Sequence, residues 1–437
     1  LFGGVGPLGV GGGGGGWWGF WGVWFLRGGG GLGGWWYGYG VGGGACRTME
    51  QEGFSFDYTG HLLHLRRPES LDLLKALGLG RSFRSHRRRA GILLAGRVTP
   101  YPIQIHTARL PGPIRRQCLL GFIRAWAQDP GEAENFGQWV LSRFGEGFAQ
   151  HFFFPYNRKL FCRDPFDLTT EWVGRYVPRP ELEDVVDGAL GLFPPSRAVG
   201  YNARFLYPRR GGIGVLAQSL ARSLQRLYLR APVVGVDLAQ REVVVGEGQR
   251  FAYDALVATG PLPQLVAMAH PLPDDLRARV DELAAVAVWN LNLAVRGRAR
   301  RREHWLYCPE PHLPFYRVGF PSNHGQLAPP GHHTLSVEVS TPSGTAPPAG
   351  WEMACVQALT REGLLASEQE VLFTVVACVD PAYVIFDRRR PSVVAAFREF
   401  FLKHGVFLCG RWAEWKYSTM EDALWDGAAV ARRLVGA

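Results

Sequence analysis

The stretch RRGGIGVLAQSLARSLQRLYLRAPVVGVDLAQREVVVGEGQRFAYDALVATG, residues 209–260, decides the fold class. Four leucines recur at helical spacing and predict a helix with one apolar face: Leu216, Leu220, Leu224 and Leu227. The β-branched runs PVVGV and REVVV, separated by a polar turn, predict strands. The order of turn, helix, strand, hairpin and strand indicates an α/β protein.

A related pattern closes the chain. The segment GVFLCGRW, residues 405–412, predicts a buried strand that runs into a glycine. The segment STMEDALWDGAAVARRLV, residues 418–435, predicts a helix capped by Ser418 or Thr419, with acidic residues in its first turn. A strand, a glycine turn and a helix N-terminus together form a site for an anion or a polarised oxygen.

The region between these units mixes short motifs and helices. Residues 69–80 predict a short helix, and GILLAGRVTPYP, residues 91–102, predicts a β-hairpin followed by extended chain. Residues 113–154 predict mainly helix that ends at Pro155. Its aromatic and apolar side chains at helical spacing are expected in the core: Phe136, Trp139, Val140 and Phe144.

The N-terminal segment has a composition of its own. Residues 1–45 hold 23 of the 57 glycines and 6 of the 15 tryptophans. Within LFGGVGPLG, the residues Gly4, Gly6 and Gly9 fit the dinucleotide-binding pattern GxGxxG. The glycines that follow would make a poor helix, and the predicted strand VWFLR ends in Arg27, where a ribose-binding acid is expected.

Composition excludes several classes of protein. A chain of 437 residues with 47% hydrophobic and 20% charged residues can form two or three domains with a large core. The longest apolar run near the start, residues 17–26, is too short to span a bilayer, and no basic segment of a signal peptide precedes it. The patterns GxSxG, HExxH and a P-loop lysine are absent, so hydrolases and metalloproteases lack their usual motifs.

Charge and cysteines indicate the environment. The net charge is +10, with arginine clusters at residues 84–89 and 296–302, which a solvated surface explains more simply than a polyanion partner. No nucleic-acid motif accompanies them, so no nucleic-acid partner is expected. Seven cysteines without CxxC or metal-ligand spacing indicate unpaired thiols, no metal site and a cytoplasmic protein.

Several motifs carry a family resemblance. The segment VGGGACRT, residues 41–48, resembles the second flavin-binding motif of amine-oxidase-like flavoproteins. The motifs GRVTPYPIQ, FGQWVLSRFGEGFAQHFFFPYNRKLF, GYNARFLYPRRGGIG, HWLYCPEPHLPFYRVGFPSN and GRWAEWKY follow in order and resemble the UDP-galactopyranose mutases, especially the eukaryotic type. The resemblance implies a Rossmann-like FAD-binding domain of the GR2 type, with inserted helical and mixed-sheet substrate domains.

This resemblance also divides the chain. FAD-binding parts are expected at residues 1–66, 201–270 and 401–437. A mainly helical substrate or cap region is expected at 67–200, and a mixed-sheet substrate region at 271–400.

The family implies an unusual reaction and a set of residues. Its members interconvert UDP-galactopyranose and UDP-galactofuranose through an adduct of the sugar at N5 of reduced FAD, so the protein mainly orients the substrate and neutralises phosphate. Arg317 and Arg175 match the arginines that bind the diphosphate, and His61 matches the histidine beside the flavin. The matching substrate-binding residues are Tyr101, Gln104, Asn157, Phe161, Asn202, Trp305, Tyr307, Tyr383 and Tyr417.

For FAD, the resemblance gives a second set. Its members are Gly4, Gly6, Gly9, Gly43, Gly44, Arg47, Val233, Arg411 and Met420. Phe161 and His64 depart from the aromatic residues usual in the family, so the sugar and nucleotide stay open. No sequence feature decides between a monomer and a homo-oligomer.

Two alternatives remain beside the mutase. One is an FAD-dependent oxidoreductase of the amine oxidase or protoporphyrinogen oxidase class, which shares the cofactor motifs but needs an apolar chamber. The other is a chain whose adenylate-binding unit is damaged by a local reading-frame error in a GC-rich gene, as the compositional boundary near Ala45 suggests. Resequencing the coding DNA tests the latter, because an intact frame through this tract excludes it.

Overall fold

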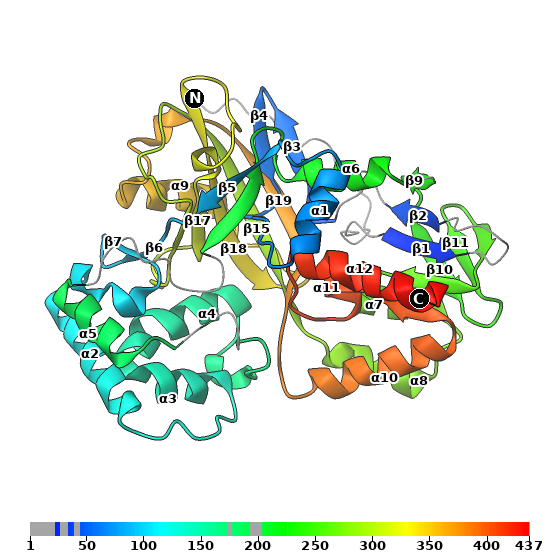
Figure 1. The fold of residues 1–437 in the computed structure, drawn as a ribbon, viewed down its shortest axis with the longest axis horizontal. Helices are drawn as coiled ribbons and strands as arrows, with labels where there is room; N and C mark the ends of the chain where they lie inside the picture. The colour runs from blue at the N-terminus through cyan, green and yellow to red at the C-terminus, as the bar shows by residue number, and fades with distance from the viewer. Residues whose placement is uncertain are drawn as a thin grey trace.

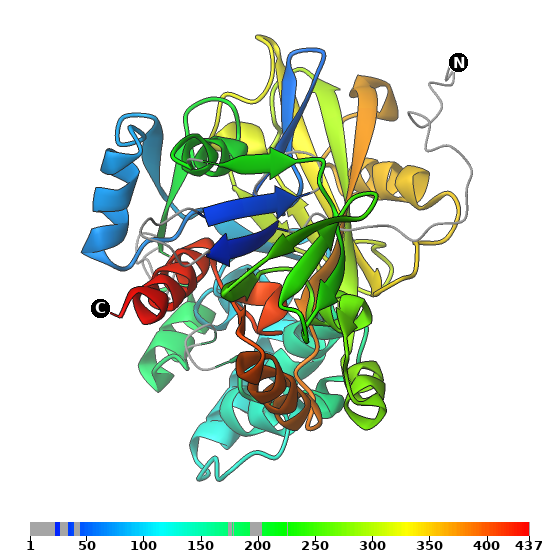
Figure 2. The same ribbon diagram turned by 90° about the vertical axis from the view of Figure 1, so that its right-hand side faces the viewer.

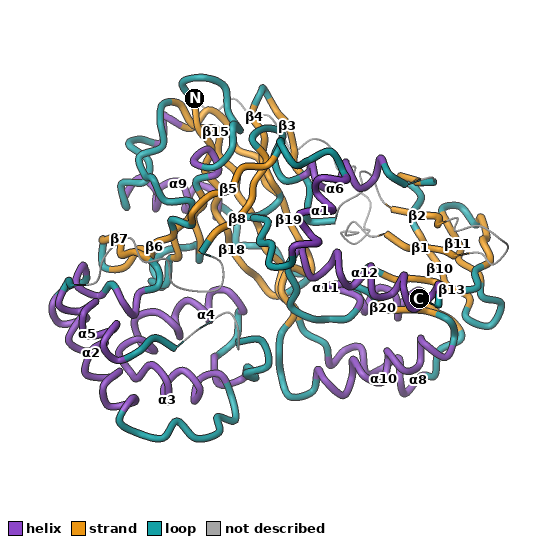
Figure 3. Tube along the Cα trace, in the orientation of Figure 1, coloured by secondary structure: helices purple, strands orange, loops and turns teal. Residues whose placement is uncertain are grey.

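A computed structural model describes residues 44–173, 177, 179–192, 203–224 and 226–436, and the backbone of residues 22–26 and 34–38. A strand-rich part with a long twisted sheet occupies the centre (Figure 1). A helical part lies against one end of this sheet, and an α/β part with the C-terminal helix lies on the other side. Figure 3 separates the helical part, in purple, from the orange strands of the central sheet.

The central sheet has seven strands in the order β19, β15, β18, β17, β16, β6 and β7. Their bounds in that order are Val371–Val384, Ala285–Arg296, His332–Pro342, Arg317–Gly319, Trp305–Tyr307, Ala90–Leu94 and Arg97–Pro100. The two long strands β15 and β18 pair antiparallel over their full length and are buried on both faces. The predicted hairpin after residue 90 is confirmed as the antiparallel pair of β6 and β7.

A five-stranded sheet forms the core of the α/β part. Its order is β20 (Val406–Leu408), β13 (Ala255–Ala258), β1 (Gly22–Leu26), β2 (Gly34–Gly38) and β9 (Leu227–Leu229). The pairs β13–β20 and β2–β9 are parallel, whereas β1 runs antiparallel to both neighbours. The short connection 27–33 explains the antiparallel pairing of β1 and β2, because a parallel pair needs a crossover of about a dozen residues or more.

Beside this sheet, a four-stranded sheet contains β12 (Gln249–Ala252), β11 (Glu242–Val245), β10 (Val233–Asp237) and β14 (Ala269–His270). The β-branched runs predicted as strands are confirmed as the antiparallel pair of β10 and β11. In Figure 2 the dark blue strands β1 and β2 lie between the red helix α12 (Met420–Val435) and these green hairpins.

The leucine-rich helix is shorter than predicted. Helix α6 spans Gly214–Arg222, so Leu224 follows its end and Leu227 opens β9. The prediction of one apolar face over four leucines was therefore wrong in its second half. Leu227 instead pairs with Trp36 of β2, because joining the sheet satisfies its backbone hydrogen bonds.

The helical part contains α2 (Gly112–Trp126), α3 (Phe136–Phe148), a π-helical turn (Ala149–Phe153), α4 (Phe154–Phe161) and α5 (Leu182–Leu190). Phe136, Val140 and Phe144 are fully buried, which confirms their core assignment, and Trp139 is partly buried against the same cluster. Pro155 does not end the helical region as predicted, because it lies in the first turn of α4, where proline loses no intrahelical hydrogen bond.

The remaining elements are short or peripheral. They are β3 (Thr48–Gln51), β4 (Phe54–Asp57), α1 (Pro68–Ala76), β5 (Phe83–Arg87), β8 (Arg204–Pro208), α7 (Leu262–Met268), α8 (Asp274–Ala278), α9 (Trp351–Arg361), α10 (Arg390–Lys403) and α11 (Gly410–Ala413). The predicted cap of α12 is confirmed at Thr419, whose side chain accepts a hydrogen bond from the Asp422 amide. Among the described residues, no helix is long and apolar enough to cross a membrane.

All seven cysteines carry free thiols, as the sequence predicts. Four of them are buried, and burial raises the pKa of the Cys118 thiol to about 12. These thiols therefore stay protonated near neutral pH.

Two helical glycines give a matched test of packing. A Cβ at Gly147 would lie 2.4 Å from backbone atoms of Gln117 and Cys118, because α3 crosses α2 there without side chains between them. A Cβ at Gly427 in α12 would meet nothing within 4 Å. We expect Gly147→Ala to lower the free energy of unfolding by about 1–3 kcal/mol and Gly427→Ala to raise it by about 0.5–1 kcal/mol. Urea denaturation measures both, and equal effects would contradict this account of the α2–α3 contact.

Candidate functional site

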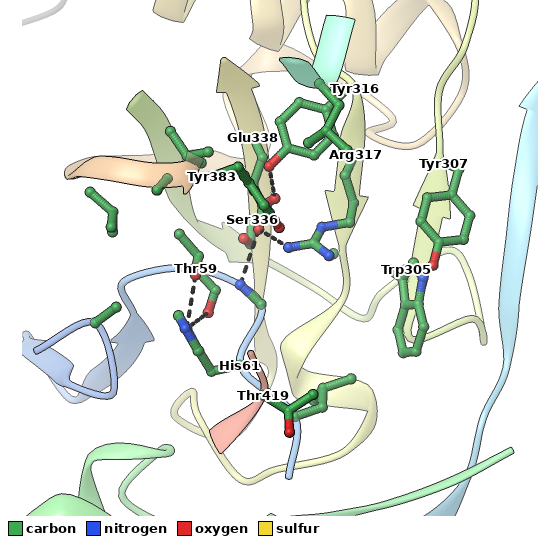
Figure 4. A pocket seen from close by; sticks show the side chains of 18 of the residues that line it. Thr59, His61, Trp305, Tyr307, Tyr316, Arg317, Ser336, Glu338, Tyr383 and Thr419 are labelled. Carbon is green, nitrogen blue, oxygen red and sulfur yellow. Dashed lines mark hydrogen bonds and ion pairs between the residues drawn. The ribbon is translucent and has the colours of Figure 1, made fainter. Parts of the chain in front are cut away.

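A cavity of about 480 Å³ lies where the central sheet, the helical part and the segment of α11 and α12 meet. Its lining comes from distant parts of the chain, including the loop after β4, α4, β17, β18 and the N-terminus of α12. Figure 4 shows the polar side of this cavity, with Arg317, Glu338, Tyr383 and His61 around one space.

A buried ion pair holds the centre of the cavity wall. Strands β17 and β18 pair antiparallel with Arg317 directly opposite Glu338, and the Arg317 Nη2 donates to Glu338 Oε1 at 2.6 Å. The Tyr316 hydroxyl donates to the other carboxylate oxygen at 2.5 Å. Cross-strand neighbours of opposite charge stabilise a sheet, and here the pair also fixes the guanidinium on the cavity side.

Opposing effects set the charges of this pair. Burial disfavours both charged forms, but the attraction and hydrogen bonds between the partners outweigh it. The pKa of Arg317 is therefore well above its ordinary value, and the pKa of Glu338 is below its own. Both groups are charged, so most of the positive charge of Arg317 is matched inside the protein.

The loop after β4 contacts both members of this ion pair. The Gly60 amide donates to Glu338 Oε1 at 3.0 Å, and a Cβ at Gly60 would lie 3.1 Å from Arg317 Nη2. The next residue, His61, has its Nδ1 2.8 Å from Thr59 Oγ1. Burial lowers the pKa of His61 to about 4, so its imidazole is neutral near pH 7 and can exchange hydrogen bonds without carrying charge.

Arg411 organises a second polar group. Its guanidinium donates to the Ala382 carbonyl from Nε at 3.2 Å and from Nη2 at 2.9 Å, and to the Ser418 carbonyl from Nη1 at 2.8 Å. The rings of Tyr383 and Tyr417 stack 6.1 Å apart, and the guanidinium carbon lies 5.0 Å and 4.8 Å from their centroids. Strand β19 thereby places Tyr383 beside the C-terminal segment.

The N-terminus of α12 forms a further part of the cavity lining. Thr419, Met420 and Ser418 all line the cavity, and the Ser418 hydroxyl is buried without a hydrogen-bond partner among the described residues. The positive end of a 16-residue helix and a free hydroxyl suit a carbonyl or anionic oxygen. On the same side, the Cys46 thiol contacts the Met420 sulfur at 3.7 Å.

Aromatic side chains form the opposite wall. The rings of Tyr101 and Tyr307 lie 5.3 Å apart, and Tyr156 of α4 meets Tyr307 edge-on at 5.3 Å. The Trp305 Nε1 is a buried donor without a partner among the described residues. The amide of Asn157 instead donates to the Phe153 carbonyl at 2.7 Å, so its nitrogen holds the α4 backbone.

The structure brings together many of the residues that the resemblance gave. The cavity is lined by His61, Tyr101, Gln104, Asn157, Trp305, Tyr307, Arg317, Tyr383, Arg411, Tyr417 and Met420. The residues Gly4, Gly6, Gly9, Gly43, Arg175 and Asn202 lie outside the described residues.

Four assigned residues lie away from the cavity lining: Gly44, Arg47, Phe161 and Val233. Phe161 packs on Trp172 and Tyr383 behind the wall. Arg47 donates to the Gly44 carbonyl at 2.7 Å and lies over the Tyr58 ring. Val233 belongs to β10 in the four-stranded sheet.

Sequence reasoning missed Glu338, Tyr316 and Tyr156 as site residues, and it considered Ser418 only as a possible helix cap. A signal existed for Glu338, because it is the lone charge in the otherwise uncharged run TLSVEVS, and a charged residue is rarely buried without a partner. Tyr156 and Tyr316 carry no comparable signal, since buried tyrosines are common in cores. Only the fold places them beside Arg317.

Asp57 anchors the base of the cavity. It ends β4 and accepts hydrogen bonds from the Thr48 hydroxyl at 2.6 Å, the Tyr207 hydroxyl at 2.6 Å and the Ile213 amide at 3.0 Å. The carboxylate therefore ties β3 and β4 to the start of α6. Burial nevertheless raises the pKa of Asp57 to about 6, because the three hydrogen bonds only partly offset the loss of hydration.

A family model for flavin containing amine oxidoreductases matches residues 40–435. The chain belongs to this family. A flavin is therefore the expected prosthetic group, and the fold is the flavin amine oxidase type with both helices and mixed sheets.

Solved structures share the fold at low sequence identity. A crystal structure of reduced UDP-galactopyranose mutase gives a TM-score of 0.85 at 24% identity, covering 92% of this chain and 88% of that chain. A putative protoporphyrinogen oxidase from Exiguobacterium sp. 255-15 gives 0.67 at 16% identity, covering 91% and 92%. Wild-type putrescine oxidase bound to putrescine gives 0.62 at 14% identity, covering 92% and 93%.

The described residues fit a flavin ring at the α12 side of the cavity. The unpartnered Ser418 hydroxyl and the helix N-terminus suit its carbonyl oxygens, and the neutral His61 lies on the same cavity wall. Residues 1–43, where the dinucleotide turn was expected, contribute no side chain to the described part. The described residues therefore test only whether the site suits the isoalloxazine ring, and not the adenine end of the cofactor.

Asp57 gives a pH-dependent prediction. Its folded pKa of about 6 exceeds the ordinary value of 3.8, so the folded state holds the proton more tightly, and the stabilisation from this proton is lost as pH rises through about 6. We expect the free energy of unfolding of Asp57→Asn, relative to that of the native chain, to increase as pH rises from 4.5 to 7.5, because only the native chain loses this stabilisation. Urea denaturation at both pH values measures this difference.

The exposed carboxylate Asp275 provides the control, since surface substitutions usually change stability by less than about 0.5 kcal/mol. A stability difference for Asp57→Asn that stays constant or falls with pH would contradict the raised pKa.

Proposed function

We propose that the chain is an FAD-dependent nucleotide-sugar mutase that interconverts UDP-galactopyranose and UDP-galactofuranose or a closely related sugar pair. The observation that carries the proposal is the division of the cavity into two walls. One wall holds Arg317, Tyr383 and Tyr417, which suit phosphate oxygens, and the other holds Tyr101 and Tyr307, which suit a base or sugar face.

The described lining offers orientation rather than a nucleophile. The Cys46 thiol, the cavity-lining thiol, has a pKa raised to about 12 by burial and then by Asp57, so it is unreactive near pH 7. In this proposal, FAD when bound supplies the reduced ring nitrogen that attacks the anomeric carbon of the sugar. The protein residues hold the diphosphate, align the sugar and exclude water.

Individual residues have distinct tasks in this proposal. Arg317 presents its guanidinium to the diphosphate, while Glu338 and Tyr316 fix its position. The hydroxyls of Tyr383 and Tyr417 donate hydrogen bonds to phosphate oxygens without adding charge. Ser418 and the start of α12 would hold the flavin ring, and the neutral His61 on the same cavity wall would exchange hydrogen bonds with it.

An FAD-dependent oxidoreductase acting on an amine or an apolar substrate is the second candidate. The observation in its favour is that Glu338 matches the charge of Arg317, which leaves less positive charge for a diphosphate.

We infer a cytoplasmic enzyme in either case, with the mutase supplying a furanose sugar for cell-wall polysaccharides. The seven free thiols support the reducing compartment.

The direct test is an assay on the purified full chain. Its visible spectrum reports bound flavin, and conversion of UDP-galactopyranose is measured with and without dithionite. Isomerisation that requires the reductant supports the mutase. Bound flavin without such isomerisation, together with amine-dependent oxygen consumption, would identify the oxidoreductase instead.

Arg317→Lys tests the phosphate role. A lysine keeps the charge beside Glu338 but loses the planar fork that binds two oxygens, so we expect kcat/KM to fall by about 10- to 100-fold while the flavin content stays constant. Steady-state kinetics and the flavin-to-protein ratio measure the two quantities. The exposed Arg361→Lys serves as the control, and an unchanged kcat/KM in Arg317→Lys would remove Arg317 from substrate binding.

A further inference from the structure

A row of arginines that have no carboxylate partner among the described residues lies on the two-stranded ribbon of β5 and β8. Six exposed arginines lie on or directly beside these strands: Arg84, Arg87, Arg89, Arg204, Arg209 and Arg210. None of the six pairs with a carboxylate in the part of the chain that the structure describes. Two of them make neutral contacts, Arg204 to the Ser85 hydroxyl at 3.3 Å and Arg210 to the Gln326 carbonyl oxygen at 2.9 Å. We name these six residues the arginine ribbon.

The pairing of the two strands concentrates this charge. Arg87 stands directly opposite Arg204 in the antiparallel register. Like charges at such positions destabilise a sheet, since their Cβ atoms are about 5 Å apart. The ribbon therefore carries an electrostatic cost that a negatively charged ligand would relieve.

Hydrogen bonds and a ring contact join the arginine ribbon to the cavity wall. The His64 Nδ1 lies 3.1 Å from the Arg204 carbonyl oxygen, and the Arg89 amide donates to the His304 Nδ1 at 3.1 Å. Both histidines line the cavity. The guanidinium carbon of Arg88 also lies 4.7 Å from the centroid of the Tyr101 ring, another lining residue. The ribbon thus flanks the aromatic side of the site.

The arginine charges lower the pKa values of two neighbouring histidines, the half-buried His86 and the buried His304. Burial lowers the pKa of His86, and the neighbouring guanidinium groups of Arg84, Arg89 and Arg209 lower it further. The pKa of His304 falls to about 3, through burial first and Arg89 second. Among the described residues, the groups that lower these two pKa values are arginines and a histidine, and no carboxylate raises them.

The cavity interior adds little net positive charge of its own. Glu338 matches Arg317 at 2.6 Å, and the second arginine of the described lining, Arg411, is balanced by the carboxylate of Asp57 when that group is ionised. Attraction of an anion from solution therefore depends on charge outside the cavity. The arginine ribbon is the cluster of exposed, unmatched charge that the described contacts place beside it.

We propose that the arginine ribbon is an electrostatic capture surface for the diphosphate of the nucleotide-sugar substrate, which raises the rate of its entry into the cavity. This inference rests on the proposed function, since it takes the ligand to be a nucleoside diphosphate sugar. Clustered charge beside a cleft raises association rates of charged ligands and loses this effect at high salt. The ribbon contributes to the association rate and leaves the bound complex unchanged.

The test measures UDP binding to the full flavin-loaded chain by stopped-flow tryptophan fluorescence. Ionic strength is varied from about 0.01 M to about 1 M, where the Debye length falls from about 30 Å to about 3 Å. We expect Arg87→Ala/Arg204→Ala to lower the association rate about 3- to 10-fold at low salt, with no difference at high salt and an unchanged dissociation rate. The Arg87→Lys/Arg204→Lys variant should keep the native association rate, because long-range attraction depends on the positive charge and not on the planar shape of the guanidinium group.

The control is Arg361→Ala/Arg432→Ala, which removes the same charge from exposed positions on α9 and α12. UDP binding with equal rates in the ribbon and control variants would overturn the inference while leaving the mutase proposal intact. A ribbon variant with a faster dissociation rate would also overturn it, by showing a direct binding site. Absence of UDP binding to the native chain would overturn the proposed function and this inference together.

A sedimentation experiment with lipid vesicles tests whether the arginine ribbon binds a membrane instead of the substrate. Vesicles of phosphatidylserine and phosphatidylcholine are sedimented with the native chain and the ribbon variant. Co-sedimentation that the ribbon variant loses, with unchanged UDP association, would reassign the surface to anionic lipid and overturn the inference.

Discussion

The ion pair between Arg317 and Glu338 is the constraint on which the site depends. Taking two charges out of water costs several kcal/mol per ion, and only close geometry with further hydrogen bonds offsets that cost. The Tyr316 hydroxyl and the Gly60 amide supply those hydrogen bonds. The pair therefore requires that β17, β18 and the loop after β4 meet in one register, and this requirement fixes the cavity wall.

The same wall depends on the sheet that carries it. Strand β15 lies between β18 and β19, so it sets the distance between Glu338 and Tyr383. Arg411 then joins the end of β19 to the start of α12 through the Ala382 and Ser418 carbonyls. The substrate wall and the proposed flavin wall are thus held together by one strand order and one guanidinium, although their residues lie far apart in the sequence.

Local patterns predicted much of the fold. The hairpins β6–β7 and β10–β11, helix α12 and its Thr419 cap follow from β-branched runs, turn residues and capping chemistry within a few residues of each other. The α6 prediction failed at its C-terminal end, since Leu227 gains backbone partners from β2, a contact that no local pattern contains. The role of Pro155 failed for a related reason, because a proline that ends one helix can also start another.

The site residues also divide into those that a short sequence motif identifies and those that only contacts between distant strands reveal. Family motifs supplied Arg317, Tyr383 and Arg411, but each motif describes one strand or turn, whereas the charge state of the site depends on what lies opposite. Glu338 follows Arg317 by 21 residues and meets it only through the register of β17 and β18. Because that register matches the charge of Arg317 with Glu338, the proposed diphosphate would be held by hydrogen-bond geometry, and its long-range attraction would come from the exposed arginines beside the cavity.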